Sequence, residues 1–293
     1  MTKYGTVSEG RRFVSKQKKL KRFPIVTYFL LILLSLYIIV PFWIVFVSGI
    51  KTVQEAGAIE FTWWPKRGVT WLAFKRVFED GSLLRGFGNT LKYGLLPLSV
   101  GLFVSTMSAY GFEKMRWRGR NMMFQFLLLT MMLPGCVTMT ATRLMYDTIG
   151  WTGTALPLMI PGMFGGIGVV FFLRQYMKGV PNELIDAAKI DGAGDFGTFV
   201  VIIIPLSMPA IFTQLVLCFL GTYNDYMGPL LYIIDEDMYT LQLALRNMIG
   251  MYRFDVPRQM AASFVAMMPM LIIYLFAQNY ILKGISMSSG LKG

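Results

Sequence analysis

Long apolar blocks alternate with short polar segments along the 293-residue chain. A helix of about 20 apolar residues crosses the ~30 Å hydrocarbon core of a bilayer, and neighbouring helices allow such a helix to contain proline. The pattern therefore predicts an all-α polytopic membrane protein with six transmembrane helices. The blocks cover residues 25–47, 90–112, 121–141, 155–177, 201–222 and 260–282.

Composition supports a membrane protein, because only 15% of the residues are charged, against about 25% in soluble domains. The first block could instead be a secretory signal. Its 23 residues exceed the 7–15 of a signal h-region, and no small-x-small cleavage site follows it. We expect a basic N-terminus at 1–24, a transmembrane domain at 25–284 that includes a polar loop at 178–205, and a C-terminal tail at 285–293.

The net charge of +12 is unevenly distributed, with eight Lys and Arg in residues 1–24 and four in 113–120. When alternate loops are assigned to one side of the membrane, and Arg174 and Lys92 inside the blocks are counted with the nearest loop, that side holds 17 basic and 6 acidic residues. The other side holds 11 and 10. The positive-inside rule then places both termini in the cytoplasm. We interpret the basic runs as topology and lipid-headgroup signals, because no nucleic-acid motif accompanies them.

Motifs for covalent chemistry are missing from the sequence. It has no histidine, and Cys136 and Cys218 lie singly within apolar blocks, which argues against a metal site and suggests small packing residues. It also lacks GxxxxGK[ST], so it does not bind ATP in the P-loop manner. We expect no enzyme activity and no cofactor.

The polar segment after the fourth block predicts a short amphipathic helix. Pro181 suits a helix start, acidic residues in the first turns suit the helix dipole, and glycines end the helix before the fifth block. The residues alone allow either an ordinary capped surface helix or a docking face on which two alanines form a shallow surface. The residues concerned are Glu183, Leu184, Asp186, Ala187, Ala188, Asp191, Gly192 and Gly194.

Two external features each have two interpretations. The tryptophans in residues 48–89 suit either an interfacial belt or a docking surface for an external protein. Tyr223, Asn224 and Asp225 end the fifth block. At membrane depth such an Asp is a functional-site candidate, whereas it is only an interfacial charge if the span ends earlier.

The segment from Asp186 resembles the EAA loop of binding-protein-dependent ABC importer permeases. That pattern is EAA, three residues, Gly, nine residues and Ile-x-Leu-Pro. Asp186-Ala187-Ala188 stands for EAA, Gly192 follows the gap, and Ile202, Ile204 and Pro205 close the pattern. The departures, Asp for Glu and Ile for Leu, are chemically mild.

Other segments resemble the carbohydrate branch of that family, specifically G-type permease subunits of maltose transporters. Asn89-Thr90-Leu91 opens the expected second span, Ala109-Tyr110-Gly111-Phe112 closes it, and the glycine-rich tail is similar as well. Tyr223-Asn224-Asp225-Tyr226 stands where many sugar permeases have Trp-Asn-Asp/Glu-Phe. The overall pattern is also compatible with an alginate-type permease subunit.

The resemblance implies a type I importer permease (MetI-like) fold in the bacterial cytoplasmic membrane. It implies three kinds of partner: a second permease subunit, an ABC ATPase dimer that binds ATP and Mg, and an extracytoplasmic substrate-binding protein. It also implies residue roles. The expected ATPase-coupling residues are Glu183, Asp186, Ala187, Ala188, Asp191, Gly192 and Pro205; the pathway residues are Tyr223, Asn224 and Asp225; the binding-protein contacts are Met248, Tyr252 and Arg253; the ATPase-contacting tail residues are Gly290 and Lys292.

The expected substrate is an oligosaccharide, either acidic and alginate-like or neutral and maltose-like. The first external loop together with Lys92 just after it carries a net charge of +3, but the external side as a whole is near +1, so charge favours an acidic sugar only slightly. The alternative from another class is an ion-coupled secondary transporter. Such a transporter is expected to have an ion-binding carboxylate at the middle of the membrane and inverted repeats. Asp225 is the one candidate for that carboxylate, and no internal repeat is evident in the sequence.

Overall fold

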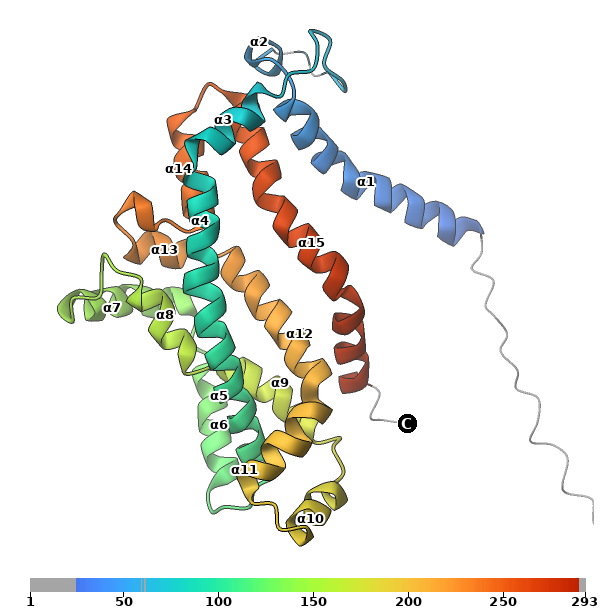
Figure 1. Cartoon of the computed structure of the whole chain (residues 1–293), viewed down its shortest axis with the longest axis vertical. Coiled ribbons are helices and arrows are strands. Elements are labelled where there is room, and N and C mark those ends of the chain that lie inside the picture. Colours follow the sequence, from blue (N-terminus) through green and yellow to red (C-terminus); the bar gives the residue numbers. More distant parts are fainter. Residues whose placement is uncertain (1–24, 59, 61, 290–293) are drawn as a thin grey trace, which may run out of the picture. The chain divides into compact units, whose positions relative to one another are not determined.

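The computed structural model describes residues 25–58, 60 and 62–289, and the described part is helical without strands (Figure 1). The chain divides into two compact units, Met1–Ile44 and Val45–Gly293. In the first, the described residues belong to α1 (Ile25–Gly49), and the side chains from Phe29 to Pro41 are all exposed. An apolar helix exposed on all sides suits contact with lipid.

The second unit contains the remaining helices. Their bounds are α2 Val53–Ala56, α3 Leu72–Asp80, α4 Ser82–Thr90, η1 Leu91–Leu95, α5 Leu96–Glu113, α6 Arg120–Thr130, α7 Gly135–Thr148, α8 Leu156–Met163, α9 Ile167–Met177, α10 Asn182–Ile190, α11 Asp195–Thr198, η2 Phe199–Ile203, α12 Ile204–Tyr223, α13 Met227–Tyr232, η3 Glu236–Met238, α14 Leu241–Met251 and α15 Val256–Ser289.

Five helical stretches of the described chain are long and apolar enough to cross a membrane: Ile25–Gly49, Ser82–Glu113, Leu156–Met177, Asp195–Tyr223 and Val256–Gln278. The sixth predicted span is not one straight helix, because α6 and α7 meet at an angle of 89°. The bend lies just before Pro134, and a proline disfavours helical conformation in the residue before it. With this bent pair counted as one span, the six predicted spans are all present.

The predicted starts of the second and fifth spans were wrong. The second helical stretch begins at Ser82 rather than at 90, so Asn89 and Thr90 lie within it instead of opening it. The fifth begins at Asp195 rather than at 201, so the last part of the predicted polar loop 178–205 is already helical. In both cases polar residues continue the helix beyond its apolar block.

Each of these two long helices contains one π-helical turn, Leu91–Leu95 and Phe199–Ile203. Pro97 and Pro205 follow these turns directly, in the first turn of α5 and of α12. A proline has no N–H to donate and its ring collides with the carbonyl of an earlier turn. The widened turn accommodates this defect without ending the helix, so the proline that closes the EAA-like pattern has a structural role.

α5 crosses the break between α8 and α9 at very close range. A Cβ added to Gly101 would collide with the carbonyl of Gly162, and the Ser105 hydroxyl accepts a hydrogen bond from the N–H of Gly166 (3.2 Å). Gly165 has φ +81°, which a residue with a Cβ rarely adopts. Small residues therefore let these helices approach, as is common in membrane bundles.

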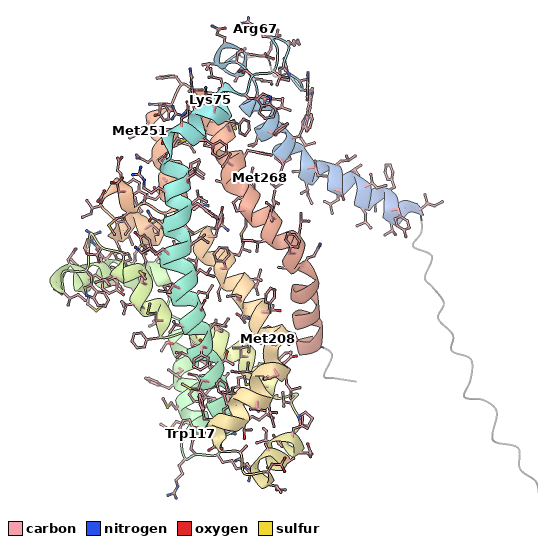
Figure 2. The ribbon with its side chains drawn as sticks, in the orientation of Figure 1. Arg67, Lys75, Trp117, Met208, Met251 and Met268 are labelled. Carbon is pink, nitrogen blue, oxygen red and sulfur yellow. The ribbon has the colours of Figure 1, made fainter. Side chains whose placement is uncertain are left out.

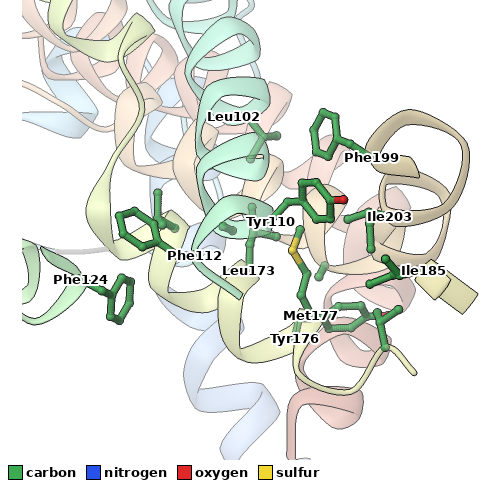
Figure 3. Packing of buried hydrophobic residues seen from close by; sticks show 14 residues of the cluster. Leu102, Tyr110, Phe112, Phe124, Leu173, Tyr176, Met177, Ile185, Phe199 and Ile203 are labelled. Atoms are coloured by element: carbon green, nitrogen blue, oxygen red, sulfur yellow. The ribbon is translucent and has the colours of Figure 1, made fainter. Parts of the chain in front are cut away.

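Two hydrophobic clusters form the core of the second unit. The first packs α5, α6, α9 and the start of the fifth span together, with α10 at its edge (Figure 3), and includes Tyr110, Phe112, Leu173, Met177, Ile185, Phe199 and Ile203. The second packs α3, α4, α12, α14 and α15, and includes Val77, Leu83, Tyr223, Leu241, Ala244, Met248 and Ala262. The long helices α5 and α12 connect the two clusters (Figure 1).

The segment before α3, which the sequence predicts to be external, is folded around one carboxylate. Glu55 accepts hydrogen bonds from the hydroxyl of Thr62 (3.0 Å) and the backbone N–H groups of Lys66 (2.8 Å) and Arg67 (3.1 Å). The bond from Lys66 is the main reason that the pKa of Glu55 lies below its usual value. Trp63, Trp64 and Trp71 are exposed, which suits both the interfacial belt and the docking surface.

Candidate functional site

The signature helix α10 lies on the first core cluster and presents its other face outward. Ile185 and Ala188 are buried, with 6% and 8% of their surface exposed. Glu183, Asp186, Ala187 and Asp191 are exposed, as are the apolar side chains of Leu184, Ile190 and Phe196. The predicted shallow face with both alanines was therefore wrong for Ala188, which packs inward, and Ala187 alone remains outside.

The start of α10 is attached to the loop that follows α5. Lys114 donates hydrogen bonds from its Nζ to the carbonyl of Val180 (2.6 Å) and to Oδ1 of Asn182 (2.9 Å). Burial lowers the pKa of Lys114, although the carboxylates of Glu113 and Glu183 partly oppose that shift. Pro181 is the residue before the first helical one, not the first.

The end of α10 is a Schellman motif. The N–H of Ala193 donates to the carbonyl of Ala188 (2.9 Å), and the N–H of Gly192 donates to that of Lys189 (3.1 Å). Gly192 has φ +84° and is open on all sides, since an added Cβ would meet nothing within 4 Å. The glycine of the EAA-like pattern is therefore needed for its backbone conformation, not for space.

The surface beneath α10 is held by a shielded ion pair. Nε of Arg174 lies 2.9 Å from Oε2 of Glu113, with only 12% and 16% of the two side chains exposed. The guanidinium of Arg174 also covers the ring of Phe124, with its central carbon 4.0 Å from the centroid. These contacts join α5, α6 and α9 at the end of the molecule where α10 lies.

A second ion pair joins α10 to the fifth span. Nζ of Lys189 lies 3.4 Å from Oδ1 of Asp195, the first residue of α11. From Asp195 the helix runs without a break through Pro205 to Tyr223. This pair is a direct contact between α10 and a helix that reaches the other core cluster.

The prediction of Tyr223 as a pathway residue was wrong, because its side chain is buried between helices. It is 2% exposed and its hydroxyl donates to the carbonyl of Ala266 (2.7 Å), so it packs α12 against α15. Asn224 and Asp225 follow the end of α12 and are exposed. Oδ1 of Asp225 accepts from the N–H of Gly228 (3.1 Å), which fits the alternative of a carboxylate beyond the helix end.

Of the predicted binding-protein contacts, one is buried and two are accessible. Met248 is 2% exposed and belongs to the second core cluster, so its assignment as a surface contact was wrong. Arg253 is exposed, and Tyr252 is half-buried. The hydroxyl of Tyr252 donates to Oδ2 of Asp80 (3.3 Å), and its ring lies under the guanidinium of Arg258.

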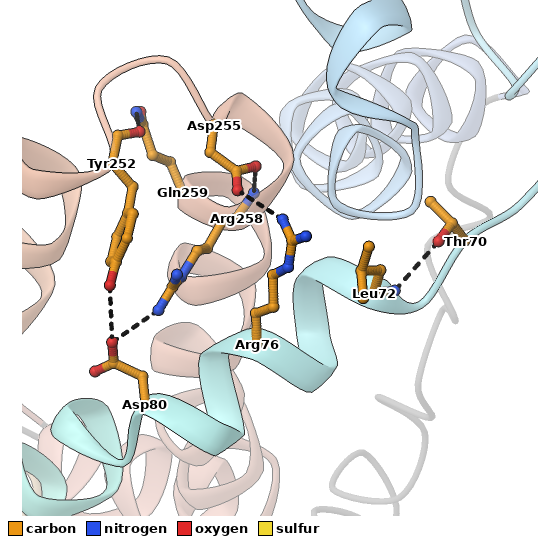
Figure 4. Close-up of polar contacts among 8 residues, drawn as sticks. All are labelled: Thr70, Leu72, Arg76, Asp80, Tyr252, Asp255, Arg258 and Gln259. Carbon is orange, nitrogen blue, oxygen red and sulfur yellow. Dashed lines mark hydrogen bonds and ion pairs between the residues drawn. The ribbon is translucent and has the colours of Figure 1, made fainter.

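Asp80 is the centre of a polar network that links α3 to the start of α15 (Figure 4). The guanidinium of Arg258 donates to Oδ2 of Asp80 (2.7 Å), and Arg76 pairs with Asp255 (3.4 Å). Burial raises the pKa of Asp80, but hydrogen bonds from Ser82 and the charge of Arg258 outweigh it and leave the pKa below its usual value.

Asn89 has a role that its sequence context does not reveal. Its Nδ2 donates to the carbonyls of Asp237 (2.8 Å) and Tyr239 (3.0 Å). Next to it, the hydroxyl of Thr90 accepts from the N–H of Leu241 (2.9 Å), and Arg85 pairs with Asp237. The segment before α14 is thus bound to α4; the polar residues were visible in the sequence, but their partners about 150 positions away were not.

The tail residues Gly290 and Lys292 lie outside the described residues. The boundary predicted at 284/285 falls inside α15, which continues to Ser289. Within the part of the chain that the structure describes, no group of three or more Cys, Asp or Glu is arranged to hold a metal ion.

Comparisons with known proteins agree with this geometry. Residues 101–287 match the family described as binding-protein-dependent transport system inner membrane component. The chain is 34% identical over 224 residues to the arabinooligosaccharides transport system permease protein AraQ of Bacillus subtilis (strain 168), covering 74% of this chain and 77% of that protein. It is 27% identical over 279 residues to the maltodextrin transport system permease protein MdxG of the same strain, covering 92% and 96%.

A solved structure shows the same fold. In a crystal structure of a bacterial ABC transporter involved in the import of the acidic polysaccharide alginate, one chain matches with a TM-score of 0.79 and 22% identity, over 92% of this chain and 99% of that chain. The predicted importer-permease fold is therefore confirmed, and an ion-coupled secondary transporter is not favoured. The match over residues 101–287 and the similarity to AraQ show that the chain belongs to the family of binding-protein-dependent transport system inner membrane components.

Proposed function

We propose that this chain is the permease subunit of an ATP-driven importer, and that α10 is the element through which an ATPase subunit acts on it. The observation that carries this proposal is the outward face of α10, a helix attached at its start by Lys114 and at its end by the Lys189–Asp195 pair. A short helix with an exposed face can move as one rigid element when a partner protein binds to that face, and its movement then acts on the helices to which it is attached. Glu183, Asp186, Ala187 and Asp191 are the residues on that face.

Transport by alternating access then needs two states of the membrane helices, biased by nucleotide on one side and by a docked binding protein on the other. ATP and Mg bind to the partner ATPase, and this chain catalyses no covalent step. A second permease subunit completes the pathway, and the end of the molecule with α3 and α14 receives the binding protein. On that end Tyr252 and Arg253 are the candidate contacts that remain accessible.

The proposed orientation places α10, the basic loop 113–120 and both termini in the cytoplasm of a bacterial cell. It is supported by 17 basic residues against 6 acidic ones on that side, as the positive-inside rule requires. The segment from Glu55 to α3 and the Asp80 network then face outward.

The proposed substrate is an oligosaccharide. Relatives are named for both kinds of sugar: AraQ (34% identical) for arabinooligosaccharides and MdxG (27%) for maltodextrin, and YtcP of Bacillus subtilis (27%) for polygalacturonan and rhamnogalacturonan, which are acidic. The alginate importer supports the fold alone at 22% identity. The neutral alternative is preferred because AraQ has the higher identity. The preference is tested by measuring uptake of labelled maltodextrin or arabinan fragments in the presence of unlabelled competitors. We expect unlabelled neutral oligosaccharides to compete and uronate oligomers not to. If only uronate oligomers competed, the preference would be reversed.

The coupling proposal is tested with a photocrosslinking amino acid at position 187 in cells that express the tagged full-length chain. We expect a crosslink to a protein that contains GxxxxGK[ST], identified by mass spectrometry. The matched control is the same amino acid at Lys75, which is exposed at the opposite end of the second unit (Figure 2). A crosslink to the ATPase from position 75 but not from 187 would contradict the proposal.

A further inference from the structure

A cavity of about 790 Å³ lies between the loop after α5 and the inner edge of α10. A smaller one of about 300 Å³ adjoins it at the start of α6 and shares three of its lining residues. Figure 2 shows Trp117, one of the three, at the end of the second unit opposite Lys75. The shared residues are Arg116, Trp117 and Arg120.

The lining of the larger cavity is basic. Five cationic side chains face three carboxylates, and two of the carboxylates are already engaged, Glu113 by Arg174 and Asp195 by Lys189. Within the described chain, Lys114 and Arg120 bond to backbone carbonyls or an amide oxygen rather than to a carboxylate. The basic residues are Lys114, Arg116, Arg120, Lys178 and Lys189.

An apolar surface begins where the cavities end. Met122, Met123 and Phe126 on the first turns of α6 have 78%, 52% and 68% of their surface exposed. Trp117 is 42% exposed beside them, and tryptophan favours the headgroup level of a bilayer. Basic groups and exposed apolar helix surface are therefore adjacent, at the membrane boundary of a chain that spans it.

We propose that these joined cavities bind the phosphate headgroup of an anionic phospholipid whose acyl chains lie along α6. Basic pockets between transmembrane helices on the cytoplasmic side suit such headgroups. Neither a soluble anion nor an acidic peptide would need the apolar surface of α6. Because the cavity also borders α10 through Asn182, Ile185 and Asp186, an occupied site would connect the loop 113–120 to the proposed coupling helix.

Lipid retention by the purified full-length chain tests this site. After exchange into detergent with equal amounts of phosphatidylglycerol and phosphatidylcholine, native mass spectrometry should show preferential retention of phosphatidylglycerol. The double variant Arg116→Gln, Lys178→Gln removes two exposed charges. Each charge contributes about a factor of five to the affinity for an anionic lipid, so we expect the variant to bind phosphatidylglycerol roughly thirtyfold more weakly. The matched control Lys66→Gln, Arg67→Gln should retain phosphatidylglycerol unchanged.

Three results would overturn the proposal: equal retention of the two lipids, equal loss in the control variant, or displacement of phosphatidylglycerol by an equal concentration of inorganic phosphate. The charge-preserving variant Arg116→Lys, Lys178→Arg should bind like the natural chain and so excludes misfolding as the cause of a loss. Lipid binding does not depend on transport, so its failure leaves the proposed function untouched.

Discussion

Gly192 illustrates a residue that is required for its backbone and nothing else. Gly192→Ala forces an alanine to φ +84°, at a cost of about 1–2 kcal/mol, and weakens the end of α10. We expect ATP-driven uptake to fall severalfold while membrane insertion stays normal. Gly194→Ala is the control, because Gly194 has φ −68° and equally open surroundings; equal effects of the two changes would contradict this account.

Tyr223 gives a prediction about stability. Tyr223→Phe removes the buried hydrogen bond to the carbonyl of Ala266 and should destabilise the folded chain by about 1 kcal/mol. Thermal melting in detergent measures this as a lower midpoint. Tyr226→Phe, a half-buried residue three positions on, should leave the midpoint unchanged. An unchanged midpoint for Tyr223→Phe would show that the hydroxyl does not hold α12 to α15.

Asp80 gives a prediction about pH. Its pKa in the folded chain is lowered, so its contribution to stability is present above the ordinary value near 3.9 and is lost as the pH falls through the lower, folded value. Asp80→Asn should therefore lower the melting midpoint at pH 7 and flatten its decline below about pH 4. Glu79→Gln breaks only an exposed pair with Lys75 and should change neither; an equal decline in both variants would exclude this role.

At the scale of the element, the sequence predicts the ends of helices from local residues but not the contacts between distant segments. The boundaries of α10 follow from Pro181 and Gly192, residues that act on their own backbone. The burial of Met248 could also have been predicted, because Leu241, Ala244 and Met248 recur at helical spacing and form one apolar face of α14. In contrast, the polar start of α4 is helical because Leu83 and Gly86 pack against other helices, and no local pattern contains that information.

The bend between α6 and α7 belongs with these non-local features. Pro134 was visible in the sequence, but a proline inside an apolar block is compatible with a straight or a bent helix. The direction of α7 is fixed by later segments. The ring of Tyr146 lies 5.2 Å from that of Tyr232, and the N–H of Gly153 donates to the Tyr232 carbonyl (2.8 Å).

At the scale of the whole molecule, those same contacts bear on the number of times the chain crosses the bilayer. They place residues 149–155 beside α13, which follows the far end of the fifth span from α10. We therefore predict that the chain passes from the loop 113–120 to the opposite side through α6 and α7, so that the bent pair is a crossing. With six crossings, the C-terminus is expected on the same side as the N-terminus.

Accessibility of single cysteines checks this path. In a Cys136→Ser, Cys218→Ala background, a membrane-impermeant maleimide added to intact spheroplasts should label Thr148→Cys as strongly as Lys66→Cys. Arg118→Cys should react only after lysis. All three positions are exposed on the folded chain, so differences in labelling report the side of the membrane rather than burial. If α6 and α7 doubled back instead, Thr148→Cys would be protected together with Arg118→Cys, the number of crossings would be odd, and the cytoplasmic C-terminus would have to be abandoned.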